Sequence, residues 1–156
     1  MEGRCQAAEE AGGEGGAVPV TCGQVMYLLD TNTCIYIIRR RPESARRKLQ
    51  STGTREVAIP IVCALELEVG ALRAQGRDYP RLVREFLALF PVLPLDDSMR
   101  GVYGALRTDL ERRGEVIGAH DMLIAAHALS LKATLVTNNE REFRRVKGLK
   151  VENWVG

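Results

Sequence analysis

Short apolar runs alternate with segments of helical periodicity from residue 26 to the end of the chain. The first run, residues 26–29, is too short for a helix and is typical of a strand buried on both faces. Such alternation indicates βα units, in which helices cover a parallel sheet. The pattern therefore predicts an α/β fold with a small parallel β-sheet flanked by helices. We expect further strands at 57–59, 134–137 and 151–154, an extended stretch at 91–95, and helices at 33–39, 42–50, 61–73, 80–90, 96–113, 118–131 and 140–145.

A single domain suits the chain length of 156 residues. Residues 1–25 lack periodicity and are rich in Gly, Ala and Glu, so we expect a disordered N-terminal extension. Met26 is an alternative start of the polypeptide, and residues 26–156 are expected to form the domain. No apolar run approaches the roughly 18 residues of a membrane-spanning helix, which predicts a protein without membrane segments.

Charge is distributed unevenly between the extension and the domain. The extension carries one of the 22 basic residues and four of the 20 acidic ones, which leaves the domain mildly basic. Such a domain suits a polyanionic substrate, although an ordinary solvated surface explains the charge equally well. The four cysteines form no CxxC pair and no signal peptide precedes them, so we expect reduced thiols in a cytoplasmic protein. Two histidines argue against a zinc site built on imidazoles.

Four acidic residues could meet in such a fold: Asp30, Glu66, Asp121 and Glu142. Asp30 directly follows the first predicted strand, at the edge where open α/β sheets build their sites. Clustered carboxylates repel one another, so a protein that gathers them usually does so around a hard cation. The pattern predicts a magnesium-type site. For Asp30, followed by Thr31 and Asn32, the alternative is an ordinary capped turn, with Thr31 or Asn32 as the helix cap.

Two glutamates lie close together in the predicted helix at 61–73. Helical periodicity places Glu66 at the border of the inward apolar stripe, which we expect to include Leu65, Val69 and Leu72. A carboxylate at that border is costly to bury unless it is paired or metal-bound. Glu68 points well away from the stripe. We therefore expect Glu66 to serve the site and Glu68 to be a solvated charge.

Asp121 is the one acid of a long apolar helix and falls in its first turn. A site role competes here with a simpler explanation, the favourable interaction of a negative charge with the positive end of a helix. We expect His120 and His127 to be structural or solvent-facing. No nucleophilic serine or cysteine arrangement is evident.

Several stretches in this order resemble the PIN-domain ribonucleases, and specifically the VapC-type toxins of type II toxin–antitoxin systems. Each motif alone is weak, whereas their joint order and spacing are specific. The resemblance covers residues 26–155. The matching stretches are LLDTN at 28–32, ELEVGA at 66–71, IGAHDMLIAAHA at 117–128 and LVTNNEREF at 135–143, and the tail at 146–154 also fits.

The resemblance implies a role for each acid. Asp30 and Asp121 match the two metal-binding aspartates of the family, and Glu66 matches its intervening catalytic glutamate. Many members carry an aspartate near position 139, where this chain has Asn139. A neutral amide supplies no negative charge, so Glu142 is our choice for the fourth position. This departure leaves the number of metal ions open, as well as the choice between Asn139 and Glu142.

The resemblance also implies a PIN fold and a Mg²⁺- or Mn²⁺-dependent endoribonuclease that cuts tRNA or rRNA at an exposed loop. It further implies a homodimer and inhibition by a cognate antitoxin protein. One alternative is a catalytically idle PIN-type module that binds RNA or a protein partner, which would show no metal-dependent cleavage. Another is a small metal-dependent phosphatase, although the sequence has no separate cap domain or glycine-rich phosphate loop.

Overall fold

A computed structural model describes residues 25–156, which form one parallel sheet with helices on both faces. The strands follow the order β3-β2-β1-β4-β5, and all neighbouring pairs are parallel. This confirms the predicted α/β architecture. The strands are β1 (Tyr27–Leu29), β2 (Val57–Pro60), β3 (Val92–Leu93), β4 (Thr134–Val136) and β5 (Val151–Glu152).

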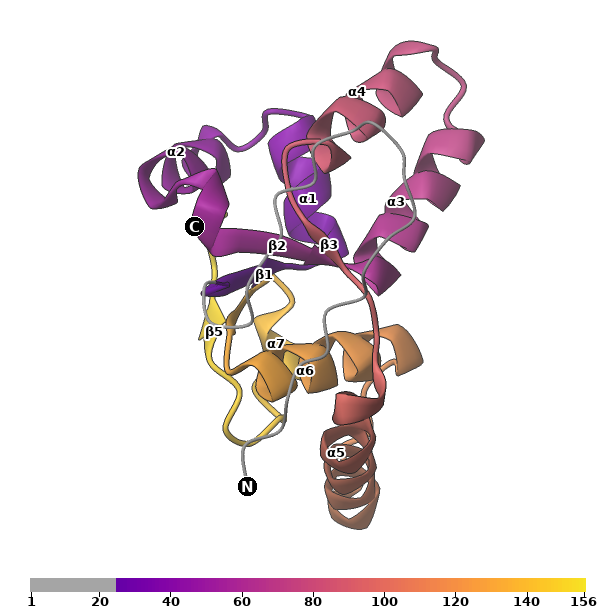
Figure 1. Ribbon diagram of the computed structural model, residues 1–156, viewed down its shortest axis with the longest axis vertical. Coiled ribbons are helices and arrows are strands. Elements are labelled where there is room, and N and C mark those ends of the chain that lie inside the picture. The colour runs from indigo at the N-terminus through magenta and orange to yellow at the C-terminus, as the bar shows by residue number, and fades with distance from the viewer. Residues whose placement is uncertain (1–24) are drawn as a thin grey trace, which may run out of the picture.

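Helices connect the strands and cover the sheet. Figure 1 shows α1 to α4 on one side of the sheet and α5, α6 and α7 on the other. The α-helices are α1 (Thr31–Ile38), α2 (Glu43–Thr52), α3 (Ile61–Arg73), α4 (Asp78–Leu87), α5 (Arg100–Arg113), α6 (Ala119–Leu131) and α7 (Glu140–Phe143), with short 3-10 helices η1 (Thr54–Glu56) and η2 (Asp97–Met99).

Strand β1 lies at the centre of the sheet. Tyr27 is in register with Val57 of β2 on one side and with Thr134 of β4 on the other. Leu28 and Leu29 are fully buried, as expected for a strand covered on both faces. Because all strands are parallel, their carboxyl ends share one edge of the sheet, and residues that follow β1 and β4 become neighbours there.

Most element boundaries agree with the sequence within a few residues. The predicted helix at 96–113 is divided into η2 and α5, because the Asp96 carboxylate accepts from the Ser98 N–H (2.8 Å) and starts a separate turn. Gly114 ends α5 with a φ of 66°, as its role as a stop signal predicts. The last strand stops at residue 152 rather than 154.

The predicted apolar face of α3 is wrong. Leu65, Val69 and Leu72 are 60%, 43% and 79% exposed. The buried face instead includes Cys63 and Leu67. Helix α3 carries two apolar stripes, and the smaller residues face the sheet because they allow the helix to pack closely.

The predicted disorder of the extension falls on residues 1–24, which lie outside the described residues. Val25, which we had assigned to the extension, packs partly buried against the core. Cys34 and Cys63 are buried free thiols, as predicted. Among residues 25–156, no helix combines the length and apolar character needed to cross a membrane.

Candidate active site

Asp30 anchors the site at the carboxyl end of β1. It is 5% exposed and caps α1, a role that we had predicted for Thr31 or Asn32. One carboxylate oxygen accepts from the Thr33 N–H (2.7 Å), and the other accepts from the Thr137 hydroxyl. Burial raises the pKa of Asp30 above its ordinary value, although these hydrogen bonds oppose the rise. The cap geometry therefore holds a buried carboxylate in one orientation.

The loop after β4 is tied to the end of β1 by further hydrogen bonds. Val136 accepts from the Asp30 N–H (3.0 Å) and from the Thr33 hydroxyl (3.1 Å). Thr137 is fully buried and accepts from the Asn139 N–H (2.9 Å). These contacts place Asn139 and the first turn of α7 beside Asp30.

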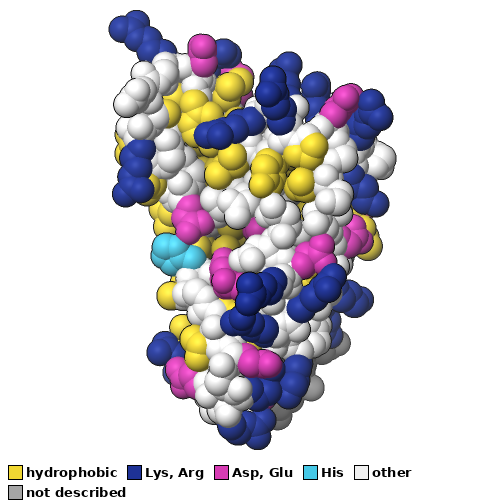
Figure 2. All heavy atoms as spheres, turned by 180° about the vertical axis from the view of Figure 1, so that it is seen from behind, with side chains coloured by type: hydrophobic (Ala, Val, Ile, Leu, Met, Phe, Trp, Pro, Cys, Tyr) yellow, Lys and Arg dark blue, Asp and Glu magenta, His cyan; other side chains and the backbone are white. Residues whose placement is uncertain are grey.

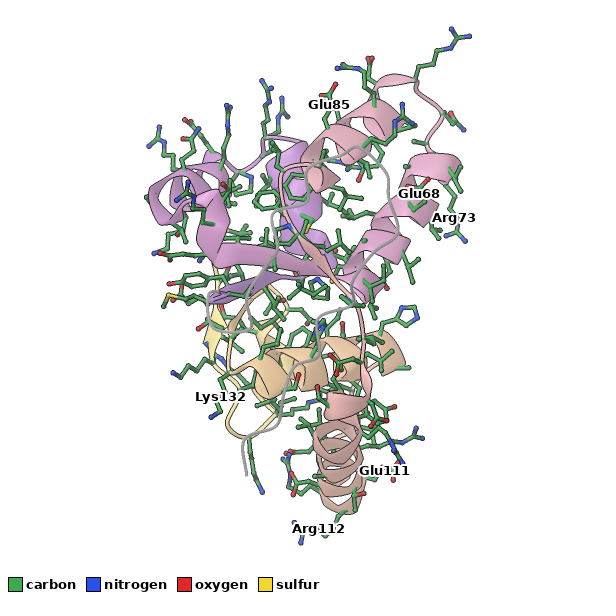
Figure 3. The ribbon with its side chains drawn as sticks, in the orientation of Figure 1. Glu68, Arg73, Glu85, Glu111, Arg112 and Lys132 are labelled. Atoms are coloured by element: carbon green, nitrogen blue, oxygen red, sulfur yellow. The ribbon has the colours of Figure 1, made fainter. Side chains whose placement is uncertain are left out.

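Glu66 reaches the same edge from α3. Its side chain is 32% exposed. Oε2 accepts from the Thr31 hydroxyl of α1, and Oε1 lies 2.6 Å from Nδ1 of His120 at the start of α6. Glu66 therefore joins three helices that are distant in sequence. Glu68, by contrast, is exposed and projects from α3 in Figure 3, as predicted.

Asp121 lies in the first turn of α6 and completes the cluster. Its pKa is raised from 3.8 to about 6, chiefly by burial and then by the neighbouring carboxyl groups of Glu142, Asp30 and Glu66. Glu66 contacts Thr31, which directly follows Asp30. It also contacts His120, which directly precedes Asp121. These contacts and the raised pKa of Asp121 locate the predicted site residues at the same edge of the sheet.

Both candidates for the fourth position lie beside Asp121. The carboxyl group of Glu142 raises the pKa of Asp121. The Asn139 side-chain nitrogen lies 3.5 Å from Oδ2 of Asp121. Glu142 can add a negative charge, whereas Asn139 can add a neutral amide.

Comparisons with known proteins show the family of the chain. A family model described as "PIN domain" matches residues 27–149. Ribonuclease VapC2 of Rickettsia felis is 36% identical over 132 residues, which are 83% of this chain and 98% of that protein. The tRNA(fMet)-specific endonuclease VapC of Salmonella typhimurium is 36% identical over 129 residues, 82% of this chain and 97% of that protein. The chain belongs to the VapC group of the PIN-domain family.

Solved structures of this family share the fold. The VapBC2 complex of Rickettsia felis, bound to a promoter DNA fragment, contains a chain with a TM-score of 0.76 and 35% identity, covering 83% of this chain and 99% of that chain. The DNA-bound VapBC of Salmonella typhimurium gives a TM-score of 0.78 and 34% identity, covering 83% and 98%. The predicted PIN fold is confirmed.

The chemistry of the VapC-type cluster suits a hard cation. Its donors are carboxylate oxygens, the ligands that Mg²⁺ and Mn²⁺ prefer. Burial is the main cause of the raised pKa values of Asp30 and Asp121, and the charges of the neighbouring acids add to it. No three Asp, Glu, His or Cys side chains within 25–156 already stand as a metal-binding group. A protein site for Mg²⁺ commonly uses only one or two carboxylates and several waters, which Asp30 and Asp121 could provide.

Sequence reasoning missed the contact between His120 and Glu66. We expected His120 to be structural or solvent-facing, and its side chain is indeed 65% exposed, but one ring nitrogen is engaged by the site. Its position directly before Asp121 was the available signal. His127 is buried, as a structural histidine would be.

Charged side chains surround the acids on the surface. Figure 2 shows acidic side chains across the middle of one face, basic side chains above and below them, and a histidine beside one acid. The arginines of two sequence clusters, 39–41 and 46–47, are exposed at the end of α1 and on α2. On this face, acidic side chains therefore lie between two groups of basic ones.

Proposed function

We propose that this VapC-group protein is a metal-dependent endoribonuclease and the toxin of a toxin–antitoxin pair. The observation that carries the proposal is the pair of contacts by which Glu66 reaches Thr31, beside Asp30, and His120, beside Asp121. The effect of Glu142 on the pKa of Asp121 supports it. The ribonuclease names of the relatives support the same activity. The proposed site of action is the cytoplasm, where RNA is available.

Each acid has a distinct proposed task. Asp30 and Asp121 hold the cation, Mg²⁺ or Mn²⁺, which when bound would acidify a water and offset negative charge on the phosphodiester. Thr33 and Thr137 fix the Asp30 carboxylate before substrate arrives. Glu66 and Glu142 complete the site and orient water near the scissile phosphate.

The proposed substrate is tRNA or rRNA at an exposed loop. A splayed loop can bring its backbone to an acidic cluster, whereas a regular RNA helix keeps its bases and deep groove inaccessible. The exposed arginines at the end of α1 and on α2 offer positive charge to an RNA backbone. The name of the Salmonella relative, a tRNA(fMet)-specific endonuclease, supports tRNA as the first substrate to try.

The proposed antitoxin would bind an apolar groove between α1, α2 and α4. Its volume is about 420 Å³, and Ile37, Leu49 and Leu82 contribute apolar walls while Arg40 and Arg46 contribute positive charge. An antitoxin segment with apolar residues and flanking acids would match this lining. The solved VapBC complexes support a partner of this kind.

The proposed homodimer would cover the exposed stripe of α3. Leu65, Val69 and Leu72 recur at helical spacing and remain exposed in the single chain. A row of this kind on a helix surface is a common mark of an interface. Light scattering on Leu72→Asp beside the wild type would detect a dimer lost by the variant.

The deciding experiment is cleavage of total RNA and purified tRNA with Mg²⁺, with Mn²⁺ and with EDTA. Asp30→Asn removes one charge with little change in volume and should give no cuts. Asp78→Asn is the matched control, because its side chain is 90% exposed in the first turn of α4. Discrete metal-dependent cuts by the wild type and the control, absent in Asp30→Asn, establish the activity. RNA binding without cleavage would instead favour an idle binding module.

A further inference from the structure

His120 and Thr31 together occupy both oxygens of the Glu66 carboxylate. The Thr31 hydroxyl donates to Oε2, and Nδ1 of His120 lies 2.6 Å from Oε1. A carboxylate oxygen accepts hydrogen bonds, so this contact favours an imidazole that carries a proton on Nδ1. Two donors on one carboxylate also restrict the rotamer of Glu66.

The Glu66 side chain needs such a restraint, because electrostatic repulsion from neighbouring carboxylates favours rotamers that point toward solvent. Its charge is felt by both Asp30 and Asp121, so the carboxylates repel. Within the described residues, no lysine or arginine forms an ion pair with Glu66. A partly exposed glutamate without these two donors would turn toward solvent, away from the cluster.

The position of His120 is suited to this task. It lies in the first turn of α6, directly before Asp121, so the helix that supplies one acid also restrains another. Glu66 and His120 line an open cavity of about 530 Å³ together with Leu65 and Arg73, so the contact lies at the surface of the single chain.

We propose that His120 is a positioning residue of the nuclease site, whose Nδ1–H holds the Glu66 carboxylate toward the acidic cluster in concert with the Thr31 hydroxyl. The inference rests on the proposed nuclease function. A purely structural role explains the contact less well, because the ring is 65% exposed and has no other hydrogen bond to residues 25–156. Small misplacements of a group that orients a reactant can cost about 100-fold in rate.

A kinetic comparison of two variants tests the proposal. His120→Phe keeps a ring but removes the donor, whereas His120→Asn places an amide N–H near the position of Nδ1. We expect His120→Phe to lower kcat about 10- to 100-fold with KM changed less than about 3-fold, and His120→Asn to recover most of the rate. Full activity in His120→Phe, or equal losses in both variants, would overturn it.

A readout without activity separates this inference from the nuclease proposal. The chain has two histidines, so the imidazole ¹⁵N spectrum of the metal-free protein is simple, and His120→Asn assigns the signals. We expect His120 in the Nδ1–H tautomer in the wild type and in Glu68→Leu, but not in Glu66→Leu, which lacks the acceptor. An unchanged tautomer in Glu66→Leu refutes the contact even if cleavage occurs. If the tautomer of His120 changes in Glu66→Leu as expected but the wild type cuts no RNA, the contact is upheld and the nuclease proposal is rejected.

Discussion

Replacing Asp121 by asparagine should make the metal-free protein more stable at neutral and alkaline pH while abolishing cleavage. The Asp121 carboxylate is a proposed metal ligand, but in the metal-free protein its negative charge destabilises the folded state. Its pKa is raised to about 6 because the group is partly buried and three other acids lie nearby. An amide of the same shape removes that electrostatic cost.

The magnitude follows from the pKa difference. A rise from 3.8 to about 6 corresponds to about 3 kcal/mol, which we reduce to about 1–2 kcal/mol because solvent screens a half-buried carboxyl. Loss of the negative charge from the first turn of α6 costs about 0.3–1 kcal/mol. The net gain is about 1 kcal/mol, equivalent to about 2–4 °C in Tm for a chain of this size.

The pH dependence has a defined sign. A folded pKa above the unfolded value means that the folded state binds the proton more tightly, so this contribution to stability is complete below about pH 4. This contribution to stability is lost as the pH rises through about 6. In Asp121→Asn, residue 121 has no ionisable group, so this pH dependence is absent. The Tm advantage of Asp121→Asn should therefore be close to zero near pH 4 and reach its full value above about pH 7.

Thermal unfolding in EDTA, at a fixed protein concentration and at several pH values, measures the effect. Asp78→Asn is the control, because it removes a first-turn aspartate that is exposed and outside the cluster, and it should be slightly destabilising at pH 8. Adding Mg²⁺ should raise the Tm of the wild type more than that of Asp121→Asn. The reasoning fails if Asp121→Asn is no more stable than the wild type at pH 8, or if their difference is independent of pH.

Three further predictions concern the other acids and the extension. Glu66→Gln should sharply reduce RNA cleavage, whereas Glu68→Gln should cleave like the wild type; similar losses in cleavage assays would contradict the assignment. Glu142→Gln should slow cleavage and should lower the pKa of Asp121, because it removes a repelling acid. Carboxyl ¹³C titration would measure the change in pKa. If cleavage is slowed by Asn139→Ala and not by Glu142→Gln, the fourth position belongs to the amide instead. Removing residues 1–24 should change the Tm in calorimetry by less than about 2 °C, and a large fall would show that they belong to the fold.

Local signals in the sequence were sufficient for most elements. Helix α3 was predicted to the residue, because Pro60 marks its start and the apolar periodicity ends at Arg73. The order of the sheet was not predictable in the same way. That β1 lies between β2 and β4 depends on pairing across more than 100 residues, and β3 and β5 have only two residues each.

The face of α3 that is buried could not be read from its sequence. The helix is apolar on more than one side, so periodicity alone allowed the stripe of Leu65, Val69 and Leu72 to be chosen. Packing against the sheet favours the side with Cys63 and Leu67, which lets the backbones approach.

The four acids of the site were predicted from their spacing and from the family resemblance, and their roles stay a prediction. Most of the side chains that hydrogen-bond to these acids could not be predicted from the sequence. Thr137 lies 107 residues from its partner Asp30, and His120 lies 54 residues from Glu66. Nothing local to either residue indicates such a contact, because it depends on which strand ends meet.

The cap at Asp30 ties the integrity of α1 to the chemistry of the site. The same carboxylate that is proposed to bind the cation also accepts from Thr33 and Thr137, both fully buried. Alanine at this position would leave two buried donors without an acceptor, and each would lower the free energy of unfolding by about 1–3 kcal/mol. Asparagine keeps an acceptor for the Thr33 N–H and is itself a good cap. An inactive form intended for capturing intact RNA or for growing crystals with an inhibitor should therefore carry Asp30→Asn, since Asp30→Ala would confuse lost chemistry with a damaged helix.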